Sequence, residues 1–189
     1  MSSFDDDLNE AVRVLKAGGI ILYPTDTIWG VGCDATNAEA VKKVYQIKRR
    51  DDSKALIVLT DDAANVARLA DMPDVAYDLI EAADRPVTVI YDRGRNMAEN
   101  LIAEDGSVGI RVTKEEFSAA LCRKLRRPIV STSANISGEP SPKFFSEISE
   151  ELKASVDYVV KYRQDDNHPK QPSMIIKLKA NGEVKIIRK

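Results

Sequence analysis

The sequence has few of the residues on which most metal sites and disulfide scaffolds depend. Its two cysteines, Cys33 and Cys122, lie far apart and outside any Cys-x-x-Cys pattern. This spacing argues against zinc ribbons and disulfide-stapled folds, and both cysteines are expected to be small core residues. The one histidine, His168, lies in a polar stretch and is expected in an exposed loop. A Ser-His triad or a histidine-rich metal site is therefore disfavoured, whereas Mg²⁺ held by carboxylates or phosphates remains open.

Long apolar runs and an excess of positive charge are also missing. No apolar run approaches the roughly 18 residues that a membrane span needs, and the acidic start of the chain does not resemble a secretory signal peptide. We therefore expect a cytoplasmic protein with no membrane partner. The 28 Lys and Arg residues are balanced by 30 Asp and Glu residues, which leaves a net charge of −2. Any site for RNA or another polyanion must then be local.

What is present is the composition of an ordinary globular domain. The chain has 189 residues, 43% of them hydrophobic and 31% charged, and shows neither an internal repeat nor a low-complexity segment. Its length predicts a single domain over residues 1–189. Apolar residues at helical spacing alternate with short apolar runs that are typical of strands. We therefore predict an α/β fold with a covered, partly parallel sheet and an antiparallel end, in an order that the sequence does not reveal.

Several helix boundaries carry specific signals. The first helix is amphipathic and is expected to stop at Gly18-Gly19. Capping boxes at 36–39 and 113–116 predict the starts of two further helices. Pro142 is suited to the first turn of a helix that would run through Leu152.

The end of the chain carries a hairpin signal. Two apolar runs, 174–178 and 184–187, flank the dipeptide Asn181-Gly182. Asn-Gly is favoured in tight type I′ turns, because both central residues of that turn have positive φ. We therefore predict a terminal hairpin with a type I′ turn.

Polar segments interrupt the pattern where predicted strands end, which is where open α/β sheets usually bind ligands. They cover residues 23–32, 48–54, 107–111 and 131–138. The stretch 30–35 fits the G-x-G-x-x-A form of the dinucleotide fingerprint, but polar residues separate its first glycine from the preceding strand. We favour the interpretation that these glycines allow a tight turn. No P-loop motif is present, so an ATP site would be of another kind.

Two of these segments offer groups that suit an anion. Lys48, Arg50 and Lys54 have the chemistry to hold phosphates, although they also fit a solvated helix end that Asp51 and Asp52 partly neutralise. The serine-rich stretch 131–137 offers hydroxyl and backbone N–H donors for carboxylates or phosphates, and equally fits a turn-rich loop. The residues alone leave both alternatives open.

Five segments, taken in order from about residue 14 to 188, resemble the YrdC-type threonylcarbamoyl-AMP synthase family. They are YPTDTIWGVG at 23–32, Lys-x-Arg and a later Lys-x-Leu-Ile at 48–57, SVGIRV at 107–112, STSANISG at 131–138 and Pro-Ser at 172–173. The resemblance implies a twisted, open, mixed sheet with helices around a deep concave cavity. It also implies a nucleotidyltransferase that makes threonylcarbamoyl-AMP and pyrophosphate from L-threonine, bicarbonate or CO₂, and ATP, with Mg²⁺. A tRNA-modifying transferase would then use the product to form N6-threonylcarbamoyladenosine in tRNA.

The same resemblance implies roles for individual residues. Threonine would be bound by Thr27, Arg111, Ser131 and Ser173. ATP would be bound by Lys48, Arg50, Lys54, Ser107, Ser133, Ser141 and Arg188. No protein nucleophile and no protein metal ligand is implied, because the carbamate formed on threonine itself attacks the α-phosphorus. Catalysis would then depend on positioning and on charge stabilisation.

The sequence departs from the family pattern at three positions near the implied sites. Asp51 stands where a proline is usual, Leu59 where some relatives have a polar threonine contact, and Met174 where a threonine commonly follows the serine. These departures raise the question of altered ATP affinity or amino-acid specificity.

Two alternative functions remain at this point. One is a YrdC- or YciO-type relative that handles a simple carbamoyl group. The other is weak RNA binding in translation, which the net charge and the lack of interleaved aromatic residues disfavour.

Overall fold

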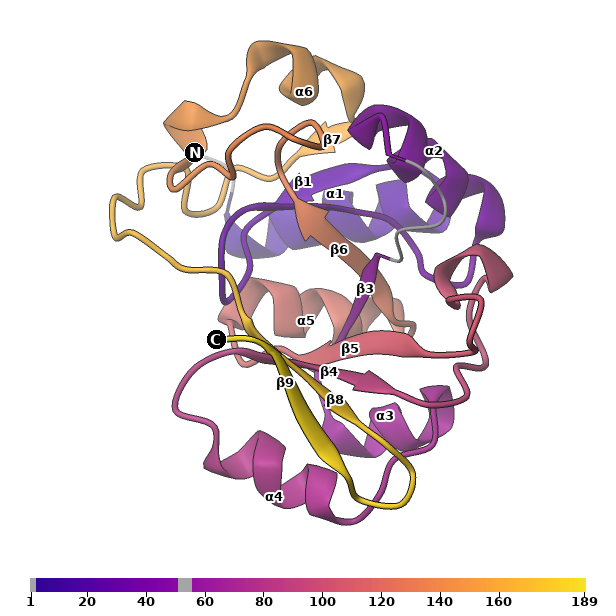
Figure 1. Ribbon diagram of the computed structural model, residues 1–189. Helices are drawn as coiled ribbons and strands as arrows, with labels where there is room; N and C mark the ends of the chain where they lie inside the picture. The colour runs from indigo at the N-terminus through magenta and orange to yellow at the C-terminus, as the bar shows by residue number, and fades with distance from the viewer. Residues whose placement is uncertain (1–2, 51–55) are drawn as a thin grey trace.

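The computed structural model describes residues 3–50 and 56–189 (Figure 1). Its helices are α1 (Phe4–Lys16), α2 (Ala38–Lys48), α3 (Ala63–Leu69), α4 (Val75–Ala82), α5 (Glu116–Leu125) and α6 (Glu150–Ser155), with 3-10 turns η1 (Glu99–Leu101) and η2 (Phe145–Glu147). Its strands are β1 (Ile21–Tyr23), β2 (Gly30–Gly32), β3 (Ile57–Thr60), β4 (Val87–Tyr91), β5 (Val108–Val112), β6 (Ile129–Ser133), β7 (Tyr158–Val159), β8 (Met174–Leu178) and β9 (Val184–Arg188). The predicted α/β class is confirmed.

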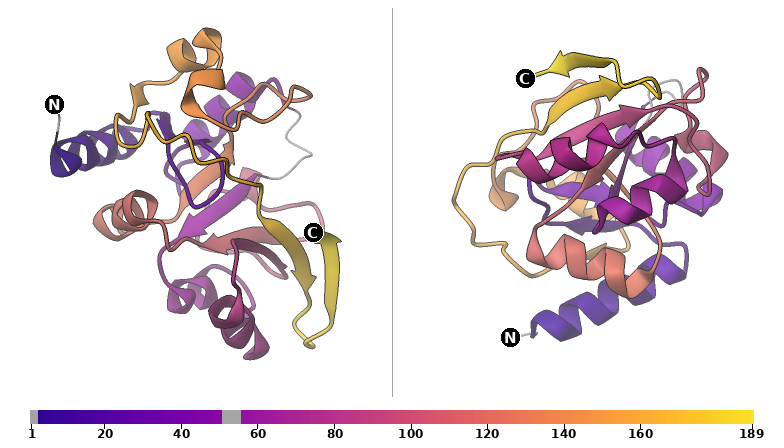
Figure 2. Two further views of the ribbon diagram at one scale, coloured as in Figure 1. Left: turned by 90° about the vertical axis from the view of Figure 1, so that its left-hand side faces the viewer. Right: turned by 90° about the horizontal axis from the view of Figure 1, so that it is seen from below.

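In this part of the chain, nine strands form one mixed sheet in the order β7-β1-β2-β6-β3-β5-β4-β8-β9. The pairs β1·β7, β3·β5 and β4·β8 are parallel, and the other neighbouring pairs are antiparallel. This bears out the expectation of a partly parallel sheet with an antiparallel end. Figure 2 shows α1 and α5 together on one side of the twisted sheet and the β8–β9 hairpin on the other.

Helix α1 shows how local sequence sets a boundary and a buried face. Ser3 accepts from the Asp6 backbone N–H, and the Asp6 side chain accepts from the Ser3 backbone N–H, which forms a capping box. The predicted stop is confirmed, because Gly18 has a φ of +77° directly after the helix, a conformation that glycine adopts readily. Phe4 packs edge-on against Phe117 of α5, with ring centroids 5.4 Å apart.

Both predicted capping boxes are wrong in detail. Helix α2 is capped by Asn37, whose side chain accepts from the Ala40 N–H, while Thr36 donates to Asp34 instead. Helix α5 is capped by Glu115, whose carboxylate accepts from two backbone N–H groups of the first turn. Thr113 lies 2.8 Å from the Ser118 hydroxyl and does not cap the helix. In each case a residue with a stronger acceptor, closer to the first turn, takes the capping position.

The glycines of the segment 30–35 do not form the tight turn that the sequence suggested. Gly30 and Gly32 lie in strand β2, which pairs with β6. A Cβ on Gly32 would lie 2.1 Å from the Val130 carbonyl oxygen, so only glycine permits this close approach of two backbones. A dinucleotide-binding fingerprint is also excluded, because its glycines would have to form the turn that starts a helix, and these glycines lie in a strand.

Two further local predictions need correction. The helix expected from Pro142 through Leu152 is broken, because Ser149 caps a new start by accepting from the Leu152 N–H, so that η2 and α6 are separate. The terminal hairpin is confirmed, but its turn is not type I′. Only Gly182 has positive φ there, and the backbone bond from Lys179 N–H to Glu183 encloses a three-residue loop.

The core supports the remaining expectations about single residues. Cys33 and Cys122 are buried among apolar side chains, and His168 is largely exposed in a loop. No helix in the described ranges is long and apolar enough to span a membrane.

Strands β3 and β6 are antiparallel neighbours near the middle of the sheet, with Ile57 opposite Ser131 and Leu59 opposite Ile129. The start of β3 therefore meets the end of β6 at one end of this pair, and the end of β3 meets the start of β6 at the other. A cavity lies at each end, and we call them the first and second cavity.

Candidate functional site

The first cavity collects most of the residues that the sequence assigned to a binding site. It has a volume of about 250 Å³ and lies where β3 begins and β6 ends. The β1–β2 connection, Arg50 after α2, strands β4 and β5, and the β8–β9 hairpin also reach it. The predicted residues that line it are Thr27, Arg50, Arg111, Ser131, Ser133, Ser141, Ser173 and Arg188.

Arg111 is the central cation of the first cavity. It lies on β5 and is only 3% exposed. Its Nη2 donates to Thr27 Oγ1 at 3.2 Å, and its Nη1 donates to Thr88 Oγ1 at 3.4 Å. Its Nε lies 3.0 Å from Asp26 Oδ1, close enough for an ion pair but without hydrogen-bond geometry. The guanidinium is thus fixed in place while part of its donor capacity remains unused.

Asp26 is a site residue that the sequence interpretation missed. It lies in the polar 23–32 segment next to Thr27, and its side chain is 12% exposed. Burial raises the pKa of Asp26, and the neighbouring Arg111 charge opposes that rise. Because the carboxylate faces the guanidinium, Asp26 supplies a built-in negative charge that balances Arg111 in the absence of a ligand.

Hydroxyl groups form a second feature of the cavity. Thr88 Oγ1 lies 2.8 Å from Ser173 Oγ, and Thr25 Oγ1 lies 3.0 Å from Thr27 Oγ1. Thr88 was interpreted only as part of a strand, because an alternating β pattern gives no sign of which side chain faces a cavity. These hydroxyls surround Arg111 with neutral donors and acceptors, a setting suited to a small ligand that carries both a carboxylate and polar groups.

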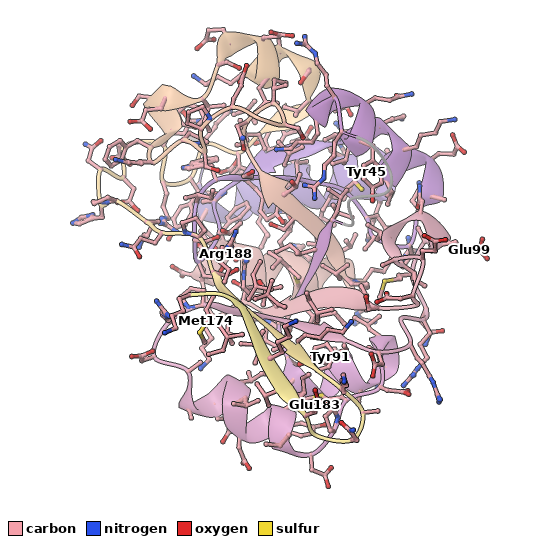
Figure 3. The ribbon with its side chains drawn as sticks, in the orientation of Figure 1. Tyr45, Tyr91, Glu99, Met174, Glu183 and Arg188 are labelled. Atoms are coloured by element: carbon pink, nitrogen blue, oxygen red, sulfur yellow. The ribbon has the colours of Figure 1, made fainter. Side chains whose placement is uncertain are left out.

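Arg188, labelled in Figure 3, belongs to strand β9 and lines the first cavity. Its Nη2 and Nε donate to the Ser173 backbone carbonyl at 2.8 and 3.2 Å. Burial and the nearby Arg111 charge lower the pKa of Arg188 from its usual high value. Together with Arg50, three guanidinium groups thus line one cavity, which favours an anionic ligand.

Lys48 lies beneath the cavity lining and is 1% exposed. Its ammonium donates to the Ser133 carbonyl at 2.5 Å and to the Asn135 carbonyl. Burial lowers the pKa of Lys48 to about 8, with a further contribution from Arg50. Lys48 thus links the end of α2 to the segment at the end of β6 through hydrogen bonds. It does not lie at the basic edge that the sequence suggested.

Another predicted ATP residue, Ser107, is not part of the first cavity. Ser107 precedes β5 and donates to Asp105 Oδ1 at 2.5 Å, and this contact lowers the pKa of Asp105 to about 2. Lys54, like Asp51, lies outside the described residues.

The two apolar departures from the family pattern lie away from the cavity. Leu59 is fully buried on β3 and pairs in register with Arg111, and its side chain does not contribute to the lining. Met174 is half-buried, and its sulfur lies 3.5 Å from Arg85. Neither residue therefore adds apolar surface to the lining of the first cavity.

Comparisons with known proteins place this architecture among characterised relatives. A family model for Sua5, YciO and YrdC proteins, described as telomere recombination, matches residues 13–189. A threonylcarbamoyl-AMP synthase of Stenotrophomonas maltophilia is 33% identical over 81% of this chain and 84% of its own length. The Xanthomonas euvesicatoria synthase is 36% identical over 82% of this chain and 84% of its own length.

Solved structures share the fold. P. abyssi Sua5 complexed with L-threonine superimposes with a TM-score of 0.81 at 23% identity, over 93% of this chain. This chain spans 52% of that protein, or about half its length. E. coli YciO superimposes with a TM-score of 0.83 at 23% identity, over 96% of this chain and 88% of its own. The expected open mixed sheet is thus confirmed.

Proposed function

Because this chain belongs to the Sua5, YciO and YrdC family, we propose that it is a threonylcarbamoyl-AMP synthase. It would combine L-threonine, bicarbonate or CO₂, and ATP into threonylcarbamoyl-AMP and pyrophosphate, which makes it a nucleotidyltransferase. The relatives with this name are 31 to 36% identical over most of the chain. The observation that carries the proposal is the first cavity, in which Arg111 is buried among hydroxyl groups and shares the lining with Arg188.

The threonine end of the cavity is centred on Arg111. In our proposal its guanidinium binds the threonine carboxylate, and the hydroxyls of Thr27, Ser131 and Ser173 complete the contacts. Asp26 holds the guanidinium from the side of Nε, 3.0 Å away, so that the η nitrogens face the ligand. A planar guanidinium suits this task because it binds a carboxylate through two parallel hydrogen bonds.

The ATP end would be formed by Arg50, Ser133, Ser141 and Arg188, which line the same cavity. Ser107 does not line this cavity, and Lys54 stays a prediction outside the described residues. Lys48 would act through the Ser133 segment that it holds. Positive side chains here would offset the charge that builds up on the phosphates as pyrophosphate leaves.

The reaction needs no nucleophile from the protein. The threonine amine takes up CO₂ to form a carbamate, and a carbamate oxygen then bonds to the α-phosphorus of ATP while the bond from that phosphorus to the bridging oxygen breaks. Pyrophosphate carries away the electron pair. The protein contributes by holding the carbamate and the phosphate in line, which converts a two-body encounter into a positioned reaction.

Mg²⁺ is part of this proposal only as a companion of ATP. In residues 3–50 and 56–189 no group of three or more His, Cys, Asp or Glu side chains fits a metal ion, so a carboxylate-held metal lacks support. Bound to the triphosphate, Mg²⁺ would neutralise phosphate charge.

The product defines the expected partners. Threonylcarbamoyl-AMP is an activated acyl group, so a transferase must consume it, and we propose a tRNA-modifying transferase that acts on adenine in the cytoplasm. The alternative is a relative that handles a simple carbamoyl group, and three departures from the family pattern suggested it. Two of these departures, Leu59 and Met174, do not line the cavity and so do not support it.

The direct test is incubation with ATP, Mg²⁺, ¹³C-bicarbonate and L-threonine, followed by mass detection of labelled threonylcarbamoyl-AMP. We expect label in the product and pyrophosphate release that requires both threonine and bicarbonate. Release at full rate without threonine would refute the proposal. Turnover with carbamoyl phosphate alone would favour the carbamoyl-handling alternative.

A further inference from the structure

The second cavity lies at the opposite end of β3 and β6 and takes no part in the proposed reaction. It has a volume of about 600 Å³. Thr60 ends β3 at its wall, and Pro128 directly precedes β6 on the same wall. Buried Leu69 of α3 and Cys122 of α5 form an apolar part of the lining. A cavity of this size and mixed lining is in the range of small-molecule sites.

Three of the arginines that line this cavity have no ion-pair partner in residues 3–50 and 56–189. Arg68 lies in the last turn of α3, Arg123 in the last turn of α5, and Arg126 directly after α5 with a φ of +58°. All three are exposed. Arg127 also lines the cavity but is different, because it pairs with Asp34 at 2.7 Å.

The charge in the second cavity is therefore unbalanced. Asp61 is the one acidic residue in the described lining, and its Oδ1 accepts from Asn65 at 3.3 Å. Three guanidinium groups thus share the described lining with one carboxylate and, within it, form no ion pair. Cations near helix C-termini are favoured by the helix dipole, which accounts for Arg68 and Arg123 separately. The dipole does not account for their convergence, together with Arg126, on one cavity.

The chemistry of the lining identifies the kind of ligand. Guanidinium binds phosphate oxygens through two parallel hydrogen bonds, and several guanidiniums in one cavity suit several phosphates. The side-chain amides of Asn65 and Asn96 line the same cavity and offer neutral contacts. An extended RNA backbone would need positive charge beyond the cavity, and the chain, with its net charge of −2, has no overall excess to supply it.

We propose that Arg68, Arg123 and Arg126 form a second anion site that binds a small ligand with two or more phosphates, of the nucleoside polyphosphate class. The site is separated from the first cavity by the length of β3 and β6. It does not rest on the proposed synthase activity.

The test uses inorganic tripolyphosphate as the probe and backbone amide NMR as a readout that reports location. Titration at constant ionic strength should shift the amide signals of Arg68, Arg123 and Arg126 in a saturable way. In the double variant Arg123→Gln/Arg126→Gln these signals should respond at least about tenfold more weakly. The matched control is Lys42→Gln/Lys124→Gln, which removes two exposed charges that do not line the cavity.

Signals from Gly30 and Ser133, at the first cavity, report independently on binding there, so failure of one site does not conceal the other. A well-dispersed spectrum of each variant shows that it is folded. Absence of saturable shifts at the three arginines would overturn the proposal. So would an equal response in the arginine variant and its control, or shifts with a short single-stranded RNA but none with tripolyphosphate.

Discussion

The two ends of strands β3 and β6 differ in how deeply their most buried cations are held. At the first cavity Arg111 and Lys48 are almost fully buried, and protein atoms bond their charged nitrogens. At the second cavity Arg68, Arg123 and Arg126 are exposed and, in the part of the chain that the structure describes, have no ion-pair partner.

This difference separates two kinds of recognition. Buried cations with fixed hydrogen bonds are arranged before a ligand arrives, so they can select for geometry and can support chemistry. Exposed cations attract by charge and order only on binding, so salt screens them more strongly. The first cavity should therefore be sensitive to small changes of side-chain shape, and the second mainly to charge.

The largest expected effect is on threonine use by Arg111→Lys. A lysine keeps the charge but loses the two-pronged contact, so the threonine concentration for half-maximal rate should rise about tenfold to a hundredfold, or roughly 1.5–3 kcal/mol. The matched control is Arg127→Lys, which alters the Arg127–Asp34 pair at the second cavity. Pyrophosphate release measured against threonine concentration checks both variants. An equal response of the two would remove Arg111 from the threonine site.

The next effect is on stability, and it concerns Lys48→Met. Removal of the buried ammonium leaves the Ser133 and Asn135 carbonyls without their donor, at a cost of about 1–3 kcal/mol in the free energy of unfolding. Lys124→Met makes the same change at an exposed position of α5 and should alter stability by less than about 0.5 kcal/mol. Urea unfolding of both variants measures the difference. Equal stability of the two variants would show that the Lys48 hydrogen bonds do not stabilise the fold.

A smaller effect is expected for ATP in Arg50→Ala. Arg50 lines the first cavity, and its loss should weaken ATP binding about tenfold while threonine binding changes little. Its neighbour Arg49 is exposed and pairs with Glu151, so Arg49→Ala is the control and should bind ATP normally. Calorimetric titration with each ligand distinguishes the two. Equal losses for ATP and threonine in Arg50→Ala would show that the assignment to phosphates is wrong.

The last expected effect, measured as a slope per pH unit, is a dependence of stability on pH. Burial lowers the pKa of Lys48 to about 8, whereas a lysine in the unfolded chain titrates near about 10.4. Between these values the unfolded chain binds the proton that the folded chain has lost, so wild-type stability should rise with pH relative to Lys48→Met. The slope should be at most about 1.4 kcal/mol per pH unit. Urea unfolding across this range tests it, and a flat difference would contradict a lowered pKa.

The sequence was sufficient for the fold class and for most helices and strands, and it named most of the residues that line the first cavity. Helix α1, the terminal hairpin and Arg111 were predicted because each depends on a local pattern or on a continuous motif. The motif 23–32 and the serines near 131–133 do meet in one cavity. Their meeting depends on the sheet order, in which β2 lies beside β6, and no local pattern carries that information.

What the sequence missed depends on contacts across the sheet. Asp26 and Thr88 are site residues only because β5 places Arg111 between them. Gly32 is a glycine because the Val130 backbone comes close, not because a turn needs it. The burial of Lys48 was missed for the same reason, since its partners lie 85 and 87 positions away in the sequence.

The contact between Arg188 and the Ser173 carbonyl has a consequence for the order of folding. Strand β8 pairs with β4, which lies about half the chain earlier. The β8–β9 hairpin brings Arg188 to the cavity that Thr27, near the start of the chain, also lines. Such long-range pairings form late, because the chain must lose the entropy of closing a long loop before the stabilising contacts can form. On the ribosome, a nascent chain without β8 and β9 should fold much of its sheet yet remain unable to hold a nucleotide. Binding competence should therefore appear in one step, when the last hairpin docks.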